Sequence, residues 1–251
     1  VEALAETSIE VRQGEFVAVI GPSGCGKSTL FNIIGGLESA DRGRVLVEGK
    51  PIEGSHKDIG MVFQEESTFP WRTVVENVAF PLEVAGLAKR EREEKAMRFV
   101  RLVGLDGFER RYPSELSGGM RQRTALARTL CAEPRILLMD EPFAALDEQT
   151  RMLLGEKLLD ICQALKQTTL FITHNLSEAV QLSDRVLVMS FRPGRIKRTV
   201  EIALPRPRSS SVIASESFAA YLGTIWEELK IEAARGMLAA ETERRGPPAQ
   251  Q

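Results

Sequence analysis

The chain has 251 residues, of which 43% are hydrophobic and 27% charged, and its formal net charge at pH 7 is −2. These values exclude disorder of the whole chain, because a sequence this apolar can bury a core. The nearly balanced charge does not favour nucleic acid as the main partner. No apolar run reaches the roughly 18–20 residues that cross a bilayer. Three scattered cysteines without a pairing pattern indicate a reducing, cytosolic compartment.

The amino-terminal part of the chain carries short apolar runs that predict strands around one helix. β-Branched and aromatic runs are typical of buried strands, and apolar residues three and four positions apart are typical of a helix. The segments with these patterns are a strand at Glu15–Ile20, a helix at Leu30–Leu37, and strand candidates at Arg44–Val47 and Ile59–Phe63. From Thr73 to about Leu130, apolar residues recur at helical spacing, which predicts a block of helices.

The carboxy-terminal part alternates strands and helices. Its segments are strands at Arg135–Met139, Thr168–Thr173 and Arg185–Met189, and a helix at about Glu148–Lys166. This alternation predicts a parallel α/β sheet, with the helical block inserted as a subdomain. The expected domains are an α/β core at about 1–69 and 132–204, a helical subdomain at about 70–131, and a tail at 205–251. In that tail, a polar, Pro-broken linker precedes an amphipathic helix at Ser215–Glu241.

A phosphate cradle follows the first predicted strand. The segment Gly21–Ser28 (GPSGCGKS) fits the pattern G-x-x-x-x-G-K-[ST] in full, between a strand and a helix. Glycines let successive N–H groups face one phosphate chain, Lys27 supplies a charge for the β- and γ-phosphates, and the Ser28 hydroxyl is a ligand for Mg²⁺. The predicted nucleotide-binding residues are Gly21, Pro22, Ser23, Gly24, Cys25, Gly26, Lys27, Ser28 and Thr29.

Cys25 lies inside this cradle and allows two interpretations. A thiol at a helix N-terminus can have a lowered pKa and react, in which case alkylation would block nucleotide binding. Alternatively, Cys25 is a small residue that fills the loop.

Two carboxylates end the strand Ile136–Glu141 (ILLMDE). Strand ends are where an α/β sheet places its ligands. In a phosphoryl-transfer site Asp140 would hold Mg²⁺ and Glu141 would polarise the attacking water. The pair also fits a helix N-cap, since Pro142 follows.

The segment Leu116–Gln122 (LSGGMRQ) resembles the signature of the ABC-transporter ATPases. Five further motifs occur in the family's order: the Walker A segment Gly21–Ser28, the Q-loop Gln64, the Walker B segment Ile136–Glu141, the D-loop Ala145–Asp147 and the switch His174. The resemblance covers roughly residues 3–200. It implies a P-loop NTPase with a RecA-like parallel sheet, an inserted helical subdomain and a small antiparallel β subdomain.

The same resemblance implies a head-to-tail dimer that binds ATP and Mg²⁺. Each ATP would lie between the cradle of one subunit and Ser117, Gly118 and Gly119 of the other, with Asp147 nearby. Gln64 would contact Mg²⁺ and water, and His174 would contact the γ-phosphate and the catalytic water. Taken alone, these residues also fit a helix-capping turn at 117–119, a polar strand end at 64 and a capping or core histidine at 174.

A softer resemblance concerns transport. The segment Phe69–Val78 resembles the importer ATPases for nitrate, sulfonate and taurine, and Met120, Met189–Ile196 and Pro205–Arg208 point the same way. It implies transmembrane permease subunits as partners, a second copy of the chain, an indirect role for an extracytoplasmic solute-binding protein, and a peripheral place on the cytoplasmic face of the membrane. Phe69 and Trp71 would form a docking groove for a permease helix; alternatively, Trp71 packs inside the helical block.

Other functions stay open from the sequence. An exporter ATPase and a non-transport ABC-family switch share the six motifs, whereas a P-loop kinase or GTPase would not explain Gln64, Asp147 and His174 in this order. In the family an aromatic that stacks on adenine precedes the cradle, and no Tyr or Trp does so here. Either upstream residues supply it and tighten ATP binding, or base recognition is weak.

Overall fold

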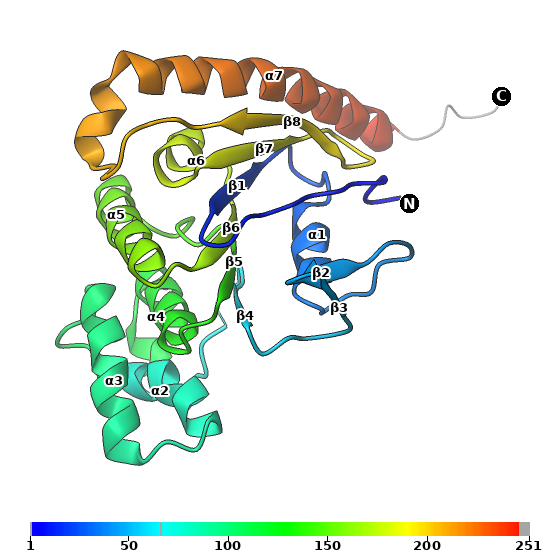
Figure 1. The fold of residues 1–251 in the computed structure, drawn as a ribbon. Coiled ribbons are helices and arrows are strands. Elements are labelled where there is room, and N and C mark those ends of the chain that lie inside the picture. Colours follow the sequence, from blue (N-terminus) through cyan, green and yellow to red (C-terminus); the bar gives the residue numbers. More distant parts are fainter. Residues whose placement is uncertain (1, 66, 246–251) are drawn as a thin grey trace.

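A six-stranded sheet organises the computed structural model, which describes residues 2–65 and 67–245 (Figure 1). The strand order is β4-β5-β6-β1-β7-β8, with the first five parallel and β8 antiparallel to β7. The strands are β1 (Phe16–Ile20), β4 (Ile59–Val62), β5 (Ile136–Asp140), β6 (Thr168–Ile172), β7 (Arg185–Met189) and β8 (Ile196–Glu201). The predicted parallel α/β core is therefore confirmed.

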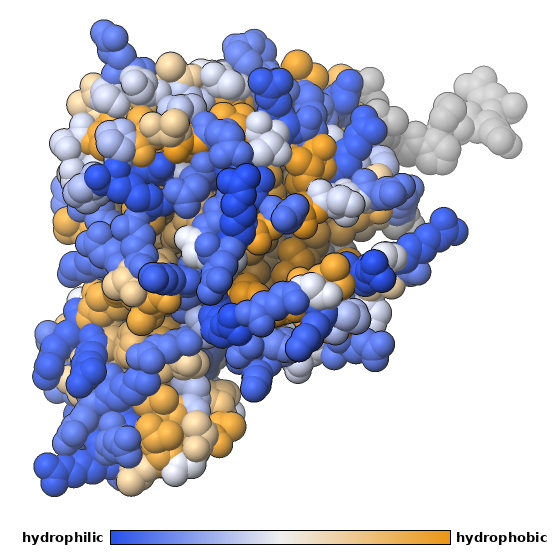
Figure 2. Space-filling model, in the orientation of Figure 1, coloured by the Kyte–Doolittle hydropathy of each residue, from blue (hydrophilic) through white to orange (hydrophobic). Residues whose placement is uncertain are grey.

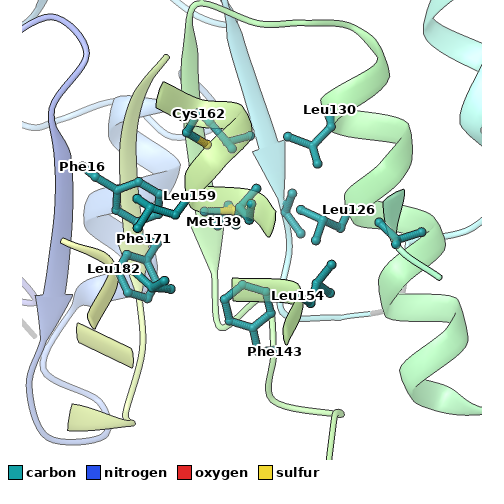
Figure 3. Packing of buried hydrophobic residues seen from close by; sticks show 14 of the residues in the cluster. Phe16, Leu126, Leu130, Met139, Phe143, Leu154, Leu159, Cys162, Phe171 and Leu182 are labelled. Carbon is teal, nitrogen blue, oxygen red and sulfur yellow. The ribbon is translucent and has the colours of Figure 1, made fainter. Parts of the chain in front are cut away.

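Strand β1 is buried along its whole length, because helices cover both faces of the sheet. Alternate side chains enter two separate cores: Phe16 and its i+2 and i+4 neighbours face one, and Val17 and Val19 face the other. In the first core the rings of Phe16 and Phe171 meet edge to face, with centroids 5.4 Å apart (Figure 3). A substitution in β1 therefore disturbs the packing of helices on whichever face it points to.

Helices from different parts of the chain cover the sheet. On one face lies α1, whose Leu30 and Phe31 are buried, and on the other lie α4, α5 and α6 (Figure 1). Their bounds are α1 (Lys27–Ile34), α4 (Gly118–Cys131), α5 (Glu148–Ala164) and α6 (Leu176–Leu182). Helix α1 thus begins at the end of the predicted cradle, earlier than expected.

The helical block consists of α2 (Val74–Val84), α3 (Lys89–Leu102) and α4, which pack against one another. Thr73 begins α2 with a capping box, because its hydroxyl accepts a hydrogen bond from the Glu76 N–H and the Glu76 carboxylate accepts one from the Thr73 N–H. The small antiparallel sheet is formed by β2 (Val45–Val47) and β3 (Lys50–Ile52).

The segment after Leu204 is anchored, unlike the expected polar linker. The Arg208 side chain is buried and donates hydrogen bonds to the carbonyls of Ser183, Ile202 and Leu204, and burial lowers its pKa to about 10. Helix α7 (Glu216–Arg245) then runs back along the edge of the sheet (Figure 1). None of the helices within residues 2–65 and 67–245 is long and apolar enough to cross a bilayer.

Candidate active site

The cradle connects β1 to α1 through a loop that needs glycine. Gly24 and Gly26 have φ angles of +72° and +97°, a region that residues with a Cβ rarely adopt. At Gly21, a Cβ would lie 2.8 Å from the Cys25 sulfur and 3.0 Å from Met189. The loop therefore turns tightly. The N–H groups at the N-terminus of α1, which have no partner within the helix, can then converge on a single anion.

Lys27 lies over this loop. Its Nζ donates hydrogen bonds to the carbonyls of Gly21, at 2.9 Å, and Pro22, at 3.0 Å. A cavity of about 380 Å³ opens beside it, lined by Ala3, Gly24, Gly26, Lys27, Ser28, Thr29 and Arg192. Five of these were singled out from the sequence, and Ala3 and Arg192 were not.

The interpretation of Cys25 as a reactive thiol is wrong. The side chain is fully buried, and burial raises the pKa of the thiol, although the nearby Lys27 opposes that shift. The local preference of a thiolate for a helix N-terminus is therefore overridden by tertiary packing. Cys25 fills the loop, in agreement with the alternative interpretation.

All three cysteines are expected to resist thiol reagents in the folded protein. Cys131 and Cys162 are buried like Cys25, and burial raises their pKa values to about 12 and about 11. Because the thiolate is the nucleophile, labelling with Ellman's reagent at pH 7.5 should be slow and should reach three equivalents only in guanidinium chloride. Rapid release of one equivalent from the native chain would contradict this expectation.

Asp140 is the last residue of β5, and β6 lies between β5 and β1 in the sheet. Burial raises the pKa of its carboxyl, and the adjacent Glu141 adds to this, while a hydrogen bond from Ser28 and the charge of Lys27 oppose it. A partly buried carboxyl beside a serine hydroxyl is a site whose negative charge a cation would stabilise.

Three residues far apart in the sequence meet at the Glu141 carboxylate. The Gln64 Nε2 donates to Glu141 Oε2 at 3.4 Å, and His174 Nδ1 lies 3.3 Å from the same oxygen. The three residues follow β4, β5 and β6, whose carboxyl ends share one edge of the sheet. The topology thus places a carboxylate, an amide and an imidazole together.

The backbone of Glu141 is strained. Its φ is +47°, in the left-handed region that non-glycine residues seldom occupy. Hydrogen bonds hold it there: its N–H donates to the Ile172 carbonyl at 3.0 Å, and its carbonyl accepts from the Gln122 side chain at 3.4 Å. Strain of this kind concentrates at functional sites.

The signature residues lie at the start of α4. Ser117 caps this helix by accepting from the Met120 N–H at 3.3 Å, and a Cβ at Gly119 would lie 2.9 Å from the Ala145 carbonyl of the D-loop. Asp147 likewise caps α5, where the hydrogen bond from the Thr150 N–H lowers the pKa of its carboxyl. The cavity at the cradle is lined by neither Gly118 nor these other residues.

Sequence reasoning missed Arg192, because strand β8 was not predicted. The run Met189–Ile196 was noted only for its resemblance to importer ATPases, whereas its residues 190–195 form the turn between β7 and β8. A Pro-Gly pair before Ile196–Glu201, a segment with three β-branched residues, is a turn signal that could have found it.

A glycine-rich loop between a strand and a helix, with a carboxylate pair at the edge of the same parallel sheet, defines a P-loop nucleoside triphosphatase. A sequence model described as ABC transporter matches residues 4–144. The chain belongs to this family and is an ATP-binding ATPase of the ABC type. The resemblance drawn from the six motifs is thereby confirmed.

Two relatives illustrate the match. The ABC transporter ATP-binding protein MJ0412 of Methanocaldococcus jannaschii is 52% identical over 237 residues, covering 94% of this chain and 88% of the relative. The aliphatic sulfonates import ATP-binding protein SsuB of Bacillus cereus is 47% identical over 218 residues, covering 87% and 84%.

Solved structures agree with the fold. The dimeric structure of the ABC transporter cassette MJ0796 aligns with a TM-score of 0.74 at 31% identity, covering 81% of this chain and 92% of that one. A second structure of that cassette, with the same coverage and TM-score, is a dimer in a post-hydrolysis state bound to ADP and phosphate.

Proposed function

We propose that this chain is the ATP-hydrolysing subunit of an ABC importer that drives uptake of a small anion of the sulfonate, taurine or nitrate type. The observation that carries the proposal is the 47% identity to the sulfonate import protein across 87% of this chain. In this proposal the chain lies on the cytoplasmic face of the membrane and acts through permease subunits, which receive solute from an extracytoplasmic binding protein.

Each residue of the site has a separate role in ATP hydrolysis. The cradle binds the triphosphate through N–H groups of the loop and of α1, and Lys27 leaves the carbonyls of Gly21 and Pro22 to contact the β- and γ-phosphates. Glu141 accepts a proton from the attacking water. His174, 3.3 Å from Glu141, orients that carboxylate and reaches the γ-phosphate side.

The donor set fits Mg²⁺. Ser28, Asp140 and Gln64 offer hydroxyl, carboxylate and amide oxygens, which are the ligands this cation prefers. The raised pKa of Asp140 also fits, because a cation would stabilise the ionised carboxyl. When bound, Mg²⁺ neutralises charge on the β- and γ-phosphates.

A second copy completes the site. Ser117 and the two following glycines stand at a helix N-terminus, which favours an anion, yet they do not line the cavity of their own chain. In the proposed head-to-tail dimer they meet the triphosphate bound to the partner's cradle. The dimeric form of the MJ0796 cassette supports this arrangement.

An aromatic cluster on the helical block is the proposed docking site for the permease. Phe69 packs between Trp71 and Phe80, with ring centroids 5.7 and 4.7 Å away, and the guanidinium of Arg128 lies 5.0 Å from its centroid. Trp71 itself is 71% exposed, so the interpretation that it packs inside the helical block is wrong.

A groove of about 320 Å³ adjoins Trp71, and charged side chains of both signs line it, including Arg72, Glu83 and Arg92. Figure 2 shows hydrophobic surface at the lower end of the molecule, where α2 and α3 lie. An exposed tryptophan beside a groove is typical of an interface anchor. A short amphipathic helix of a permease fits such a surface.

Trp71→Ala is expected to abolish most solute uptake while leaving the unfolding temperature and nucleotide affinity of the isolated chain unchanged, because Trp71 is exposed and does not line the cavity at the cradle. Loss of an interface anchor commonly weakens binding by 2 kcal/mol or more, about 30-fold. The matched control is Trp226→Ala, which removes the other tryptophan, 52% exposed on α7. Equal uptake in both variants would contradict the docking role.

Uptake also tests the importer proposal as a whole. A strain that lacks the gene should lose ATP-dependent accumulation of labelled taurine, alkanesulfonate or nitrate, and the wild-type gene should restore it. Unchanged uptake of all three anions, together with normal ATP hydrolysis by the purified chain, would favour the exporter or the non-transport switch.

A further inference from the structure

The hairpin loop between β7 and β8 reaches over the phosphate cradle. Arg192 in this loop donates a hydrogen bond from Nε to the carbonyl of Gly24 at 2.8 Å, across 168 positions of sequence. The guanidinium lies against Gly24, because a Cβ added at Gly24 would be only 2.9 Å from the Arg192 Nη2. The same side chain lines the cavity together with Lys27, Ser28 and Thr29.

No carboxylate among the described residues neutralises the charge of Arg192. Within the described part of the chain, this side chain makes the one hydrogen bond to Gly24 and no ion pair with a carboxylate. A guanidinium held through Nε still has both Nη groups available, and their planar geometry matches two oxygens of a phosphate. The cavity is therefore lined by a second cation, Arg192, in addition to Lys27.

Both ends of the described chain hold this loop in place. On one side the Glu232 carboxylate of α7, 1% exposed, accepts a hydrogen bond from the Phe191 N–H at 2.9 Å, and a Cβ at Gly236 would lie 3.2 Å from the Phe191 ring. On the other side the Gly194 N–H donates to the Ala3 carbonyl at 2.9 Å. A side chain on a loop fixed in this way loses little freedom when it binds a ligand.

We propose that Arg192 is a further nucleotide-binding residue, that it contacts phosphate oxygens of the bound nucleotide, and that Glu232 of α7 positions it. None of the six family motifs contains either residue. The inference rests on ATP binding at the cradle and does not depend on the importer role, which the uptake experiment tests separately.

The test compares affinities of the full chain for MgATP and for inorganic tripolyphosphate, which has phosphates but no base or ribose. Arg192→Ala should weaken both by about 10- to 100-fold, as expected for loss of a charge-assisted hydrogen bond, and Arg192→Lys should recover part of the loss. Arg195→Ala is the matched control, because it removes the same charge from the same loop but from a residue that does not line the cavity.

Two results would overturn the contact with phosphate. If Arg192→Ala binds both ligands as tightly as the wild type, the side chain only braces the Gly24 carbonyl. If ATP binding weakens but tripolyphosphate binding does not, Arg192 contacts the base or ribose instead.

The positioning role of Glu232 is tested by a double-mutant cycle. Glu232→Ala removes the acceptor of the Phe191 N–H, so it should raise the KM for ATP several-fold with little change in kcat, and it should have no further effect in the Arg192→Ala background. Glu228→Ala is the control, because Glu228 also pairs with Lys197 but makes no hydrogen bond to Phe191. Effects that multiply in the double variant would show that Glu232 acts independently of Arg192.

Discussion

Glu141→Gln is expected to bind MgATP as well as the wild type but to hydrolyse it about 10²- to 10⁴-fold more slowly, the range for loss of a general base. The amide has the shape of the carboxylate, so it can keep the neighbours that Glu141 has, Gln64 at 3.4 Å and His174 at 3.3 Å. What it loses is the ability to accept a proton from water. Because ATP then persists in the site, the closed dimer should accumulate.

Phosphate release under steady-state conditions measures the rate, and size-exclusion chromatography with MgATP measures the dimer. Glu201→Gln is a suitable control, since Glu201 is an exposed residue at the end of the edge strand β8. Rapid turnover by Glu141→Gln would show that Glu141 does not polarise the attacking water. His174 would then be the next candidate for that role.

Ser117→Arg should block ATP hydrolysis across the subunit interface. Ser117 caps α4, and in the proposed dimer it faces the triphosphate held by the other subunit. A long cationic side chain there would remove the cap and obstruct closure. Mixed with wild-type subunits in increasing ratio, the variant should lower their turnover, although every wild-type cradle is intact.

The assay is ATP hydrolysis in mixtures of fixed wild-type concentration. Ser211→Arg, at an exposed serine in the short helical turn before α7, should leave the rate unchanged at every ratio. If Ser117→Arg subunits do not inhibit even in large excess, each chain hydrolyses ATP alone and the shared site is refuted.

The cradle was predictable from sequence because its residues are contiguous and their chemistry is local. The positive φ angles of Gly24 and Gly26 and the position of Lys27 over the loop follow from their own side chains and spacing, and do not depend on distant segments. The buried strands were predictable for a similar reason, since a sheet covered on both faces needs continuous apolar runs such as β1.

The elements and residues that were missed depend on tertiary contacts. Strand β8 is an edge strand with mostly exposed, polar side chains, and α6 is only seven residues long, so neither has a strong periodic pattern. The raised pKa of Cys25 and the contact of Arg192 with Gly24 come from packing between segments distant in sequence. A motif cannot encode such contacts, because only the folded sheet brings those segments together.

The backbone of Glu141 has a consequence for the evolution of this protein. A non-glycine residue held at a φ of +47° destabilises the fold by about 1–3 kcal/mol, whereas glycine adopts that conformation freely. Selection for heat resistance alone would therefore favour glycine here, whereas the proposed role of Glu141 in accepting a proton from water requires a carboxylate. A glutamate retained at this position therefore lowers thermostability, and its proposed benefit is faster ATP hydrolysis.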